Sequence, residues 1–344
     1  MKKIAFIVPY FGKFPNYFPL WLLSCKYNPT IDWIVFTDDI SPYEYPSNVK
    51  VTFCKFEDIV NRLQRPFDFP IKIDRAYQLC EFKMIYGVSF SDILVNYDFW
   101  GFCDIDVIWG DLRSHITDEI LNLYKKISWR GHLTLFHNSP EINTLFKNEI
   151  EGVPFWKYAI TNITGYPIAF DEREINYIFQ EAGMPIYMEL PFADLKIRSY
   201  NFEVLHMPIS EDYKNRNQVF WWEEGQLWRV YLHDGKRYKE NFAYVHFLKR
   251  PMKFDCKNIN LNNFLIAPNK FIFCNEIPDQ NEILKLSKKK IYWSYILDRL
   301  SLKYFMNKYY YYKSKKLYSK HLGFLPSKPT NYTFPAFLKS ILID

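Results

Sequence analysis

The sequence predicts an α/β fold, with a mixed sheet flanked by helices and a basic helical appendage at the C-terminus. The sheet is predicted by two compact apolar runs, Ile4–Val8 and Asp32–Thr37, with a helical segment between them. This is the order of a βαβ unit whose parallel strands are buried. The appendage is predicted by an abrupt change in composition near residue 284, where lysines and aromatic residues begin to alternate.

The first half of the chain continues this pattern. The helix of the βαβ unit is predicted over Phe18–Tyr27 and a third strand over Val49–Phe53. Residues 56–96 have mostly helical periodicity, which is best developed over Ala76–Tyr86. Because there is no Gly-x-Gly-x-x-Gly motif, an ordinary dinucleotide-binding fold is not predicted.

The second half alternates short helices with strands and ends in an antiparallel section that spans residues 184–235. The predicted elements are a helix over Ile116–Lys126, a strand over Arg130–His137, helices over Glu141–Glu149 and Ala169–Phe179, short strands at Ile186–Glu189, Gln218–Trp222 and Gln226–Leu232, turns at Glu224-Gly225 and Asp234-Gly235, and a strand that ends at His246.

Two carboxylates one residue apart, Asp104 and Asp106, interrupt an apolar run that extends from Phe99 to Trp109. On a strand, residues i and i+2 point to the same face, so at a strand end both carboxylates can aim at one point. Close like charges repel, and a Mn²⁺ or Mg²⁺ ion resolves the conflict by binding carboxylate oxygens. The alternative is a pair of surface acids at a turn.

This pair resembles the Asp-x-Asp motif of GT-A glycosyltransferases, which holds a metal on the diphosphate of a sugar nucleotide. The longer string from Cys80-Glu81-Phe82-Lys83 through 97–101 to Gly110-Asp111 resembles an uncharacterised family of bacterial surface-polysaccharide loci. This resemblance covers residues 1–255. It implies a GT-A fold, which is Rossmann-like, and a metal-dependent glycosyltransferase.

The carboxyl ends of the first two strands form the edge at which α/β proteins bind ligands. The resemblance implies that this edge holds the base and ribose of the nucleotide and that Lys83 reaches the diphosphate. The residues at the edge are Pro9, Tyr10, Phe11, Asp38 and Asp39. A turn that merely begins at Asp38-Asp39, and a solvated Lys83, are the alternatives.

An acidic helix start at Asp171-Glu172 resembles that of the retaining family which includes glycogenin and bacterial lipopolysaccharide galactosyltransferases. The resemblance implies that Asp171 or Glu172 contacts the donor sugar or the acceptor. Acids in a first helical turn also complement the helix dipole, which is the alternative. An inverting enzyme would need a carboxylate base, for which Asp171, Glu172 or Asp194 could serve.

The segment Tyr244–Pro251 resembles the late His…Lys-Pro motif of the glycogenin-type domain, although it is shorter and lacks the glycine. The resemblance implies that His246 is a third metal ligand and that Lys249 or Arg250 neutralises the leaving phosphate. A histidine in a strand is otherwise an ordinary structural residue.

The net charge of +6 is unevenly distributed. Residues 285–344 hold 13 Lys or Arg and 2 acids, a balance of +11, whereas residues 1–284 hold 31 and 36, a balance of −5. Basic residues mixed with aromatic ones over 285–320 predict a helix on an anionic membrane surface. Nucleic acid is a competing partner that we do not expect, and a solvated tail is the alternative.

The predicted division of the chain has three parts. Residues 1–255 form a glycosyltransferase domain, with a nucleotide-binding half, 1–112, and an acceptor half, 113–255. Residues 256–284 connect this domain to the basic region 285–344. No signal peptide and no transmembrane helix is predicted. The six cysteines are far apart and several lie in apolar runs, which favours a cytoplasmic protein. The basic region and the expected lipid-linked acceptor predict a peripheral location at the inner face of the membrane.

These observations predict transfer of a sugar from a nucleotide-diphosphate sugar to a glycan or lipid-linked acceptor. The resemblance implies a role in capsule, O-antigen or lipooligosaccharide synthesis, with retention of configuration. The rival predictions are a metal-dependent nucleotidyltransferase, which also uses paired aspartates, and a non-catalytic carbohydrate-binding or scaffold protein.

Overall fold

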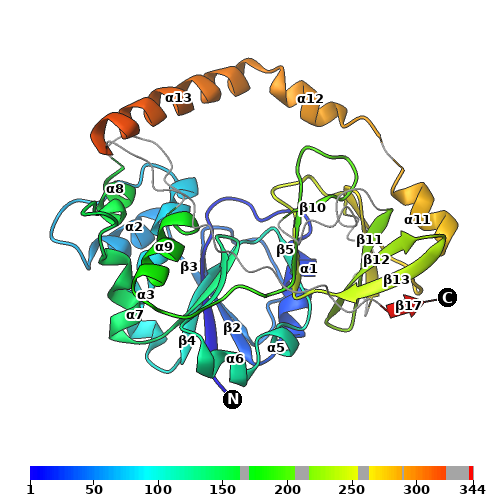
Figure 1. The fold of residues 1–344 in the computed structure, drawn as a ribbon, viewed down its shortest axis with the longest axis horizontal. Helices are drawn as coiled ribbons and strands as arrows, with labels where there is room; N and C mark the ends of the chain where they lie inside the picture. Colours follow the sequence, from blue (N-terminus) through cyan, green and yellow to red (C-terminus); the bar gives the residue numbers. More distant parts are fainter. Residues whose placement is uncertain (163–169, 206–216, 255–262, 289, 323–340, 344) are drawn as a thin grey trace.

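The computed structural model describes residues 1–162, 170–205, 217–254, 263–288, 290–322 and 341–343. Its strands form three sheets. A mixed sheet flanked by helices makes up one side of the molecule, and an antiparallel sheet makes up the other (Figure 1). A small sheet joins them, and two helices near the C-terminal end of the chain form an arc outside this body. The predicted mixed α/β class is therefore confirmed.

The main sheet has seven strands in the order β3-β2-β1-β4-β7-β6-β8. The first four are parallel to one another, as the βαβ pattern predicts, whereas β7 is antiparallel to both β4 and β6. The strands are β1 Ile4–Pro9, β2 Ile31–Thr37, β3 Val49–Phe53, β4 Phe99–Cys103, β6 Lys126–Arg130, β7 Leu133–His137 and β8 Ile186–Tyr187.

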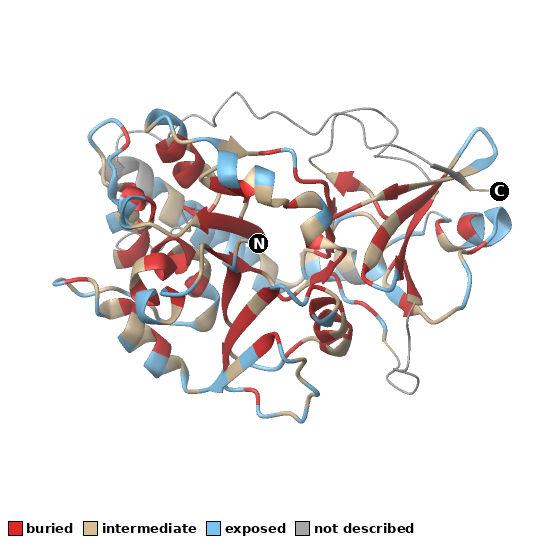
Figure 2. Ribbon diagram, turned by 90° about the horizontal axis from the view of Figure 1, so that it is seen from below, coloured by how far each residue is buried: buried red, intermediate tan, exposed pale blue. Residues whose placement is uncertain are grey.

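Alternate residues of the main sheet face two different hydrophobic cores. In β1, Ala5 and Ile7 face one core, and Ile4 and Phe6 face the other. The inner strands are consequently buried, whereas the edge strands β3 and β8 and the outer helix surfaces are more exposed (Figure 2). The flanking helices are α1 Phe18–Lys26, α2 Phe56–Gln64, the 3₁₀ helix η1 Ala76–Ile85, α3 Tyr86–Ser89, α4 Ser91–Leu94, α5 Leu112–His115, α6 Asp118–Leu123, α7 Pro140–Thr144, the 3₁₀ turn η2 Leu145–Lys147, α8 Phe155–Thr161 and α9 Arg173–Glu181.

The second sheet has four strands in the order β10-β9-β14-β5. They are β10 Val204–Leu205, β9 Phe192–Leu195, β14 Tyr244–His246 and β5 Val107–Trp109. β5 follows β4 after only three residues, Asp104–Asp106, so the chain passes from the main sheet into the second sheet within the Asp-x-Asp motif. The apolar run 99–109 is therefore two strands of different sheets.

The third sheet is antiparallel, with six strands in the order β16-β15-β11-β12-β13-β17. Its two hairpin turns, Glu224-Gly225 and Asp234-Gly235, are those predicted, and all four residues have positive φ, as a type I′ turn requires. The strands are β11 Gln218–Glu223, β12 Gln226–His233, β13 Lys236–Asn241, β15 Asn263–Ala267, β16 Lys270–Ile272 and β17 Ile341–Ile343.

Three helices follow the third sheet: α11 Gln280–Leu286, α12 Trp293–Arg299 and α13 Leu302–Leu322. α11 packs against β11 and β12, whereas α12 and α13 form the outer arc in Figure 1. A helix long and apolar enough to span a membrane is not found among the described residues.

Several element predictions are wrong in detail. The segment Arg130–His137, predicted as one strand, contains the end of β6, a turn at Gly131-His132 and all of β7, which pair as a hairpin. β6 begins at Lys126, the last residue of the predicted helix 116–126. Ala76–Ile85 forms a 3₁₀ helix. Ile186–Tyr187 joins the main sheet through β6, outside the antiparallel section.

The predicted division of the chain also differs from the observed sheets. The main sheet takes strands from both predicted halves, since β6, β7 and β8 lie beyond residue 112. The connecting segment predicted at 256–284 contains β15 and β16, which pair into the third sheet, and part of α11. Ala169, the first residue of the predicted acidic helix, lies outside the described residues.

Candidate metal centre and its cavity

The second sheet brings His246 together with Asp194 and Asp106, which are far apart in the sequence. In the parallel pair β9–β14, His246 lies opposite Asp194, and in the antiparallel pair β5–β14 it lies opposite Val107. His246 therefore lies beside the residue that follows Asp106. Strand pairing thus places the histidine against the Asp-x-Asp motif.

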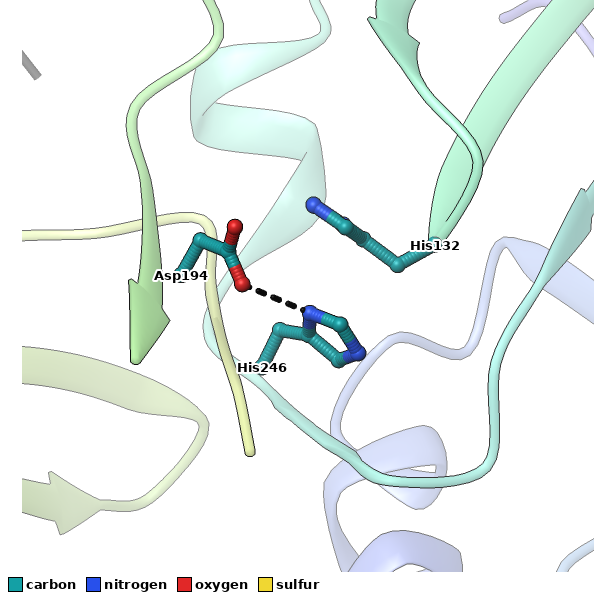
Figure 3. Close-up of side chains that lie close together, drawn as sticks. All are labelled: His132, Asp194 and His246. Atoms are coloured by element: carbon teal, nitrogen blue, oxygen red, sulfur yellow. Dashed lines mark hydrogen bonds and ion pairs between the residues drawn. The ribbon is translucent and has the colours of Figure 1, made fainter. Parts of the chain in front are cut away.

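The His246 imidazole has a carboxylate on each side. Its Nε2 lies 3.4 Å from Asp106 Oδ1 and 3.8 Å from Asp104 Oδ2. Its Nδ1 lies 2.9 Å from Asp194 Oδ1, the contact drawn in Figure 3. Asp104, Asp106 and His246 each offer one ligand atom, all within 4.8 Å of one another. Two carboxylates and one imidazole suit a small divalent cation such as Mn²⁺. These are the three predicted metal ligands.

His246 and Asp106 lie close enough to shift each other's pKa. Burial lowers the pKa of His246, but the charge of Asp106 and hydrogen bonds to Asp106 and Asp194 outweigh it and raise the pKa to about 10. For Asp106, burial raises the pKa, but His246 and the backbone N–H of Lys249 outweigh it and lower the pKa to about 2. The raised pKa favours a protonated His246 that pairs with Asp106. A bound divalent cation would take the place of the proton on Nε2.

The loop after β14 holds Asp106 through its backbone. The Phe247 N–H donates to the Asp106 carbonyl at 2.9 Å, and the Lys249 N–H donates to Asp106 Oδ2 at 2.6 Å. Both contacts require a sharp bend, in which Leu248 and Lys249 have φ of 50° and 60°. These values lie in the left-handed region, which strains residues other than glycine, and such strain clusters at functional sites.

Lys83 lies on the other side of Asp104. Its Nζ donates to Asp104 Oδ1 at 2.8 Å and to the Gly131 carbonyl at 2.7 Å, and it lies 3.6 Å from Asp171 Oδ2. Burial lowers the pKa of Lys83, but the charges of Asp104 and Asp171 outweigh it and raise the pKa above its ordinary value. Lys83 is a charged residue that orients Asp104 from η1, and not a solvated surface lysine.

The two acids before α9 have different surroundings. Glu172 accepts from the Gly131 N–H at 3.0 Å and pairs with Arg130 at 3.0 Å, so it fixes the β6–β7 turn. Asp171 is buried beside Lys83; burial raises the pKa of its carboxyl, and the charge of Lys83 opposes this shift. A Cβ atom on Gly131 would lie 2.4 Å from Asp171 Oδ2, so a larger residue at position 131 would displace this carboxylate.

A cavity of about 1150 Å³ opens beside this cluster. Most of the predicted site residues line it, namely Pro9, Tyr10, Phe11, Lys83, Asp104, Asp106, Asp171, Glu172, His246 and Lys249. Asp38 and Asp39 are not among its lining residues. Asp38 accepts from the Gly12 N–H at 2.7 Å, and Asp39 accepts from the Phe14 N–H at 3.0 Å. These two acids hold the loop after β1.

Lys249 and Arg250, which the sequence leaves as alternatives, have different roles in the fold. The Lys249 side chain is exposed, and its Nζ lies 3.9 Å from the centre of the Tyr77 ring. The Arg250 side chain is buried and donates to main-chain carbonyls of Tyr200, Lys196 and Ser199. Lys249 is thus the cation that can reach a ligand.

Two residues of the cluster are not among the predicted ligands. Asp194 fixes the His246 ring, and His132 stacks on that ring at a centroid distance of 4.3 Å (Figure 3). His132, Asp194 and His246 also form a second, fully buried group of potential metal ligands. The sequence signal for Asp194 is an acid inside the otherwise apolar segment Phe192–Leu195.

A search of curated proteins finds no match. Residues 6–275 match the Family of unknown function (DUF6625). This range includes all three sheets except β17 and the first two residues of β1, and it includes every residue of the cluster. The chain belongs to the DUF6625 family.

Proposed function

We propose that this protein is a metal-dependent glycosyltransferase that moves a sugar from a nucleotide-diphosphate sugar to a hydroxyl of a glycan or lipid-linked acceptor. The observation that carries the proposal is the orientation of His246, whose Nδ1 is bound by Asp194 while Nε2 faces Asp104 and Asp106. A carboxylate behind a histidine is the usual support of a metal-binding imidazole.

The residues fit a Mn²⁺ or Mg²⁺ ion with open coordination positions. Asp104, Asp106 and His246 would supply three ligands, and all three line the cavity that would hold the diphosphate. Such an ion, when bound, neutralises the charge that develops on a leaving diphosphate. Mn²⁺ accepts imidazole more readily than Mg²⁺ does, so Mn²⁺ is the better fit.

Two lysines support this role from opposite sides. Lys83 neutralises and orients Asp104 from within the protein, at 2.8 Å. Lys249 holds Asp106 through its main chain, which leaves the exposed ammonium available to a phosphate oxygen. A cation beside the diphosphate stabilises the departing nucleotide.

The donor sugar would lie between the metal ligands and Asp171. Asp171 lines the cavity beside Lys83, whereas Glu172 is occupied by Gly131 and Arg130. Of the two predicted acids, Asp171 is therefore the one placed to accept hydrogen bonds from sugar hydroxyls. Pro9, Tyr10 and Phe11 form a wall of the same cavity and would hold the nucleoside.

Isothermal titration of the full-length protein with UDP, GDP, CDP and dTDP, each with and without Mn²⁺, tests this proposal. We expect Mn²⁺-dependent binding of one nucleotide, lost in Asp106→Asn and retained in Asp68→Asn, which changes an exposed aspartate. Binding that ignores both Mn²⁺ and Asp106→Asn would contradict the metal site. With the matching nucleotide sugar, release of pyrophosphate in place of a nucleoside diphosphate would identify a nucleotidyltransferase.

A further inference from the structure

The segment that contains α12 and α13 is held at both ends by the third sheet. Before it, α11 packs on β11 and β12, with Ile283 fully buried. After it, β17 pairs with β13 over three residues, from Arg237↔Ile343 to Lys239↔Ile341. The segment leaves the body and returns to it, so it is better described as an arm than as a tail.

This arm exposes large apolar and aromatic side chains. Leu302, Phe305, Met306 and Tyr309 have the spacing i, i+3, i+4 and i+7, which places them on one side of the first two turns of α13. The four tyrosines Tyr309–Tyr312 are each between 43 % and 64 % exposed. In α12, Trp293 is 62 % and Leu297 63 % exposed. Exposed groups of this size and number mark an interaction surface.

The same arm is strongly basic. Between residues 290 and 317 it holds one acid, Asp298, and seven basic residues, namely Lys290, Arg299, Lys303, Lys308, Lys313, Lys315 and Lys316. Within the described residues, no acidic group lies within ion-pair distance of the lysines of α13 up to Lys316. The arm therefore combines lysines that no acid of the described residues neutralises with exposed apolar and aromatic side chains.

We propose that α12 and α13 bind the surface of an anionic lipid bilayer. Lysines attract anionic headgroups, and aromatic side chains insert at the boundary between headgroups and acyl chains. Nucleic acid would account for the charge, but it leaves the aliphatic residues Leu297, Leu302 and Met306 in water. A bilayer explains the basic, the aromatic and the aliphatic residues together.

The arm begins close to the cavity. Tyr292, one residue before α12, packs edge-on against Tyr200 at a centroid distance of 5.9 Å, and the Arg250 guanidinium lies 5.8 Å from the centre of the Tyr292 ring. Arg250 itself lines the cavity, next to Lys249. In Figure 1 the arm also lies on the side toward which the parallel strands of the main sheet point. A bound bilayer would therefore lie near the cavity.

Co-sedimentation of the full-length protein with lipid vesicles tests the proposal. We expect binding to vesicles that contain about 30 % phosphatidylglycerol, weak binding to pure phosphatidylcholine, and loss of binding as salt rises. The triple variant Lys308→Gln, Lys313→Gln, Lys316→Gln should bind on the order of 100-fold more weakly. The matched control Lys26→Gln, Lys72→Gln, Lys147→Gln changes three exposed lysines of the body and should bind normally.

A second measurement reports the apolar face directly. Acyl chains brominated near the headgroup quench tryptophans that insert, and Trp293 is the exposed tryptophan of the arm. We expect quenching by brominated vesicles that is lost in Trp293→Phe. Variant Phe305→Ser, Tyr309→Ser should weaken binding while its far-ultraviolet circular dichroism stays unchanged.

The outcomes that would overturn the proposal are distinct from those that test the transferase. No binding to anionic vesicles, equal binding to neutral ones, or binding of single-stranded RNA without vesicle binding would each overturn it. Self-association through the arm, seen as a dimer that the triple lysine variant does not change, would also overturn it. Mn²⁺-dependent nucleotide binding is measured without lipid and is independent of all these results.

Discussion

The Nδ1 atom of His246 lies 2.9 Å from the Asp194 carboxylate, and this single contact decides which ring nitrogen faces the Asp-x-Asp motif. Both residues lie at the same register position of neighbouring parallel strands, β9 and β14. The contact is therefore set by the sheet and not by a flexible loop. A metal that binds here would meet a histidine ring whose orientation is already fixed.

Asp194→Asn should reduce the affinity for Mn²⁺ by roughly 10- to 100-fold, because the amide keeps the shape of the carboxylate and loses its charge. Mn²⁺ titration followed by electron paramagnetic resonance measures the change. Asp234→Asn is a matched control, since it changes the acid of the exposed pair His233–Asp234. An unchanged Mn²⁺ affinity in Asp194→Asn would show that Asp194 does not support His246 as a metal ligand.

Lys249→Ala should weaken binding of the nucleoside diphosphate roughly tenfold, equivalent to ~1.4 kcal/mol, through loss of one charged hydrogen bond. Affinity for Mn²⁺ alone should not change, because the contact with Asp106 is made by the backbone N–H of residue 249. Two calorimetric titrations separate these effects. Lys253→Ala, a nearby exposed lysine, is the control. An equal loss of nucleotide affinity in both variants would show that Lys249 acts only through the overall positive charge of this surface.

Arg250→Lys should lower the free energy of unfolding by about 2–4 kcal/mol, because the guanidinium donates to three main-chain carbonyls and to Asn269 Oδ1, which one ammonium cannot satisfy. Chemical denaturation measures this loss. The exposed Arg65→Lys should change stability little. If Arg250→Lys instead abolished nucleotide binding with full stability, Arg250 would be a ligand-binding residue.

Lys126 predicts a pH dependence of stability. Its ammonium is fully buried, and burial lowers its pKa to about 7, from 10.5. Between these values the unfolded chain binds more protons than the folded one, so the contribution of Lys126 to the free energy of unfolding rises with pH. The slope is at most roughly 1.4 kcal/mol per pH unit.

Denaturation curves of wild type and Lys126→Met, recorded at intervals from pH 7 to 10, check this expectation. Wild type should gain stability relative to the variant as pH rises. Lys72→Met, at an exposed position, should follow wild type at every pH. Parallel curves for wild type and Lys126→Met would show that Lys126 keeps its proton in the folded state.

The first two parallel strands, β1 and β2, were predictable because each is a short apolar run followed by polar or turn-forming residues, and β3 was predictable from its alternation of apolar and polar residues. Asp104, Asp106 and His246 were predictable as a group from their order in the chain and from the family resemblance. The passage from the main sheet into the second sheet was not predictable. Both β4 and β5 are apolar throughout, so residues 99–109 give the same local pattern as one continuous strand.

Other features depend on contacts between distant segments. The pairing of Asp194 with His246 follows from the register of β9 and β14, 52 residues apart, which no local pattern records. The β6–β7 hairpin was missed because β6 begins with a buried lysine and contains a bulge in which Ser128 has a φ of 69°. Neither feature resembles the alternation that identifies a strand.

The link Asp104–Asp106 is also the covalent joint between two sheets, since β4 ends just before it and β5 begins just after it. Asp104 lies at the end of the main sheet, and His246 belongs to the second. A cation held by both would span the joint and act as a mechanical clasp between the two halves of the molecule. Binding of the cation would then restrict the movement of one sheet against the other and slow the unfolding of both sheets.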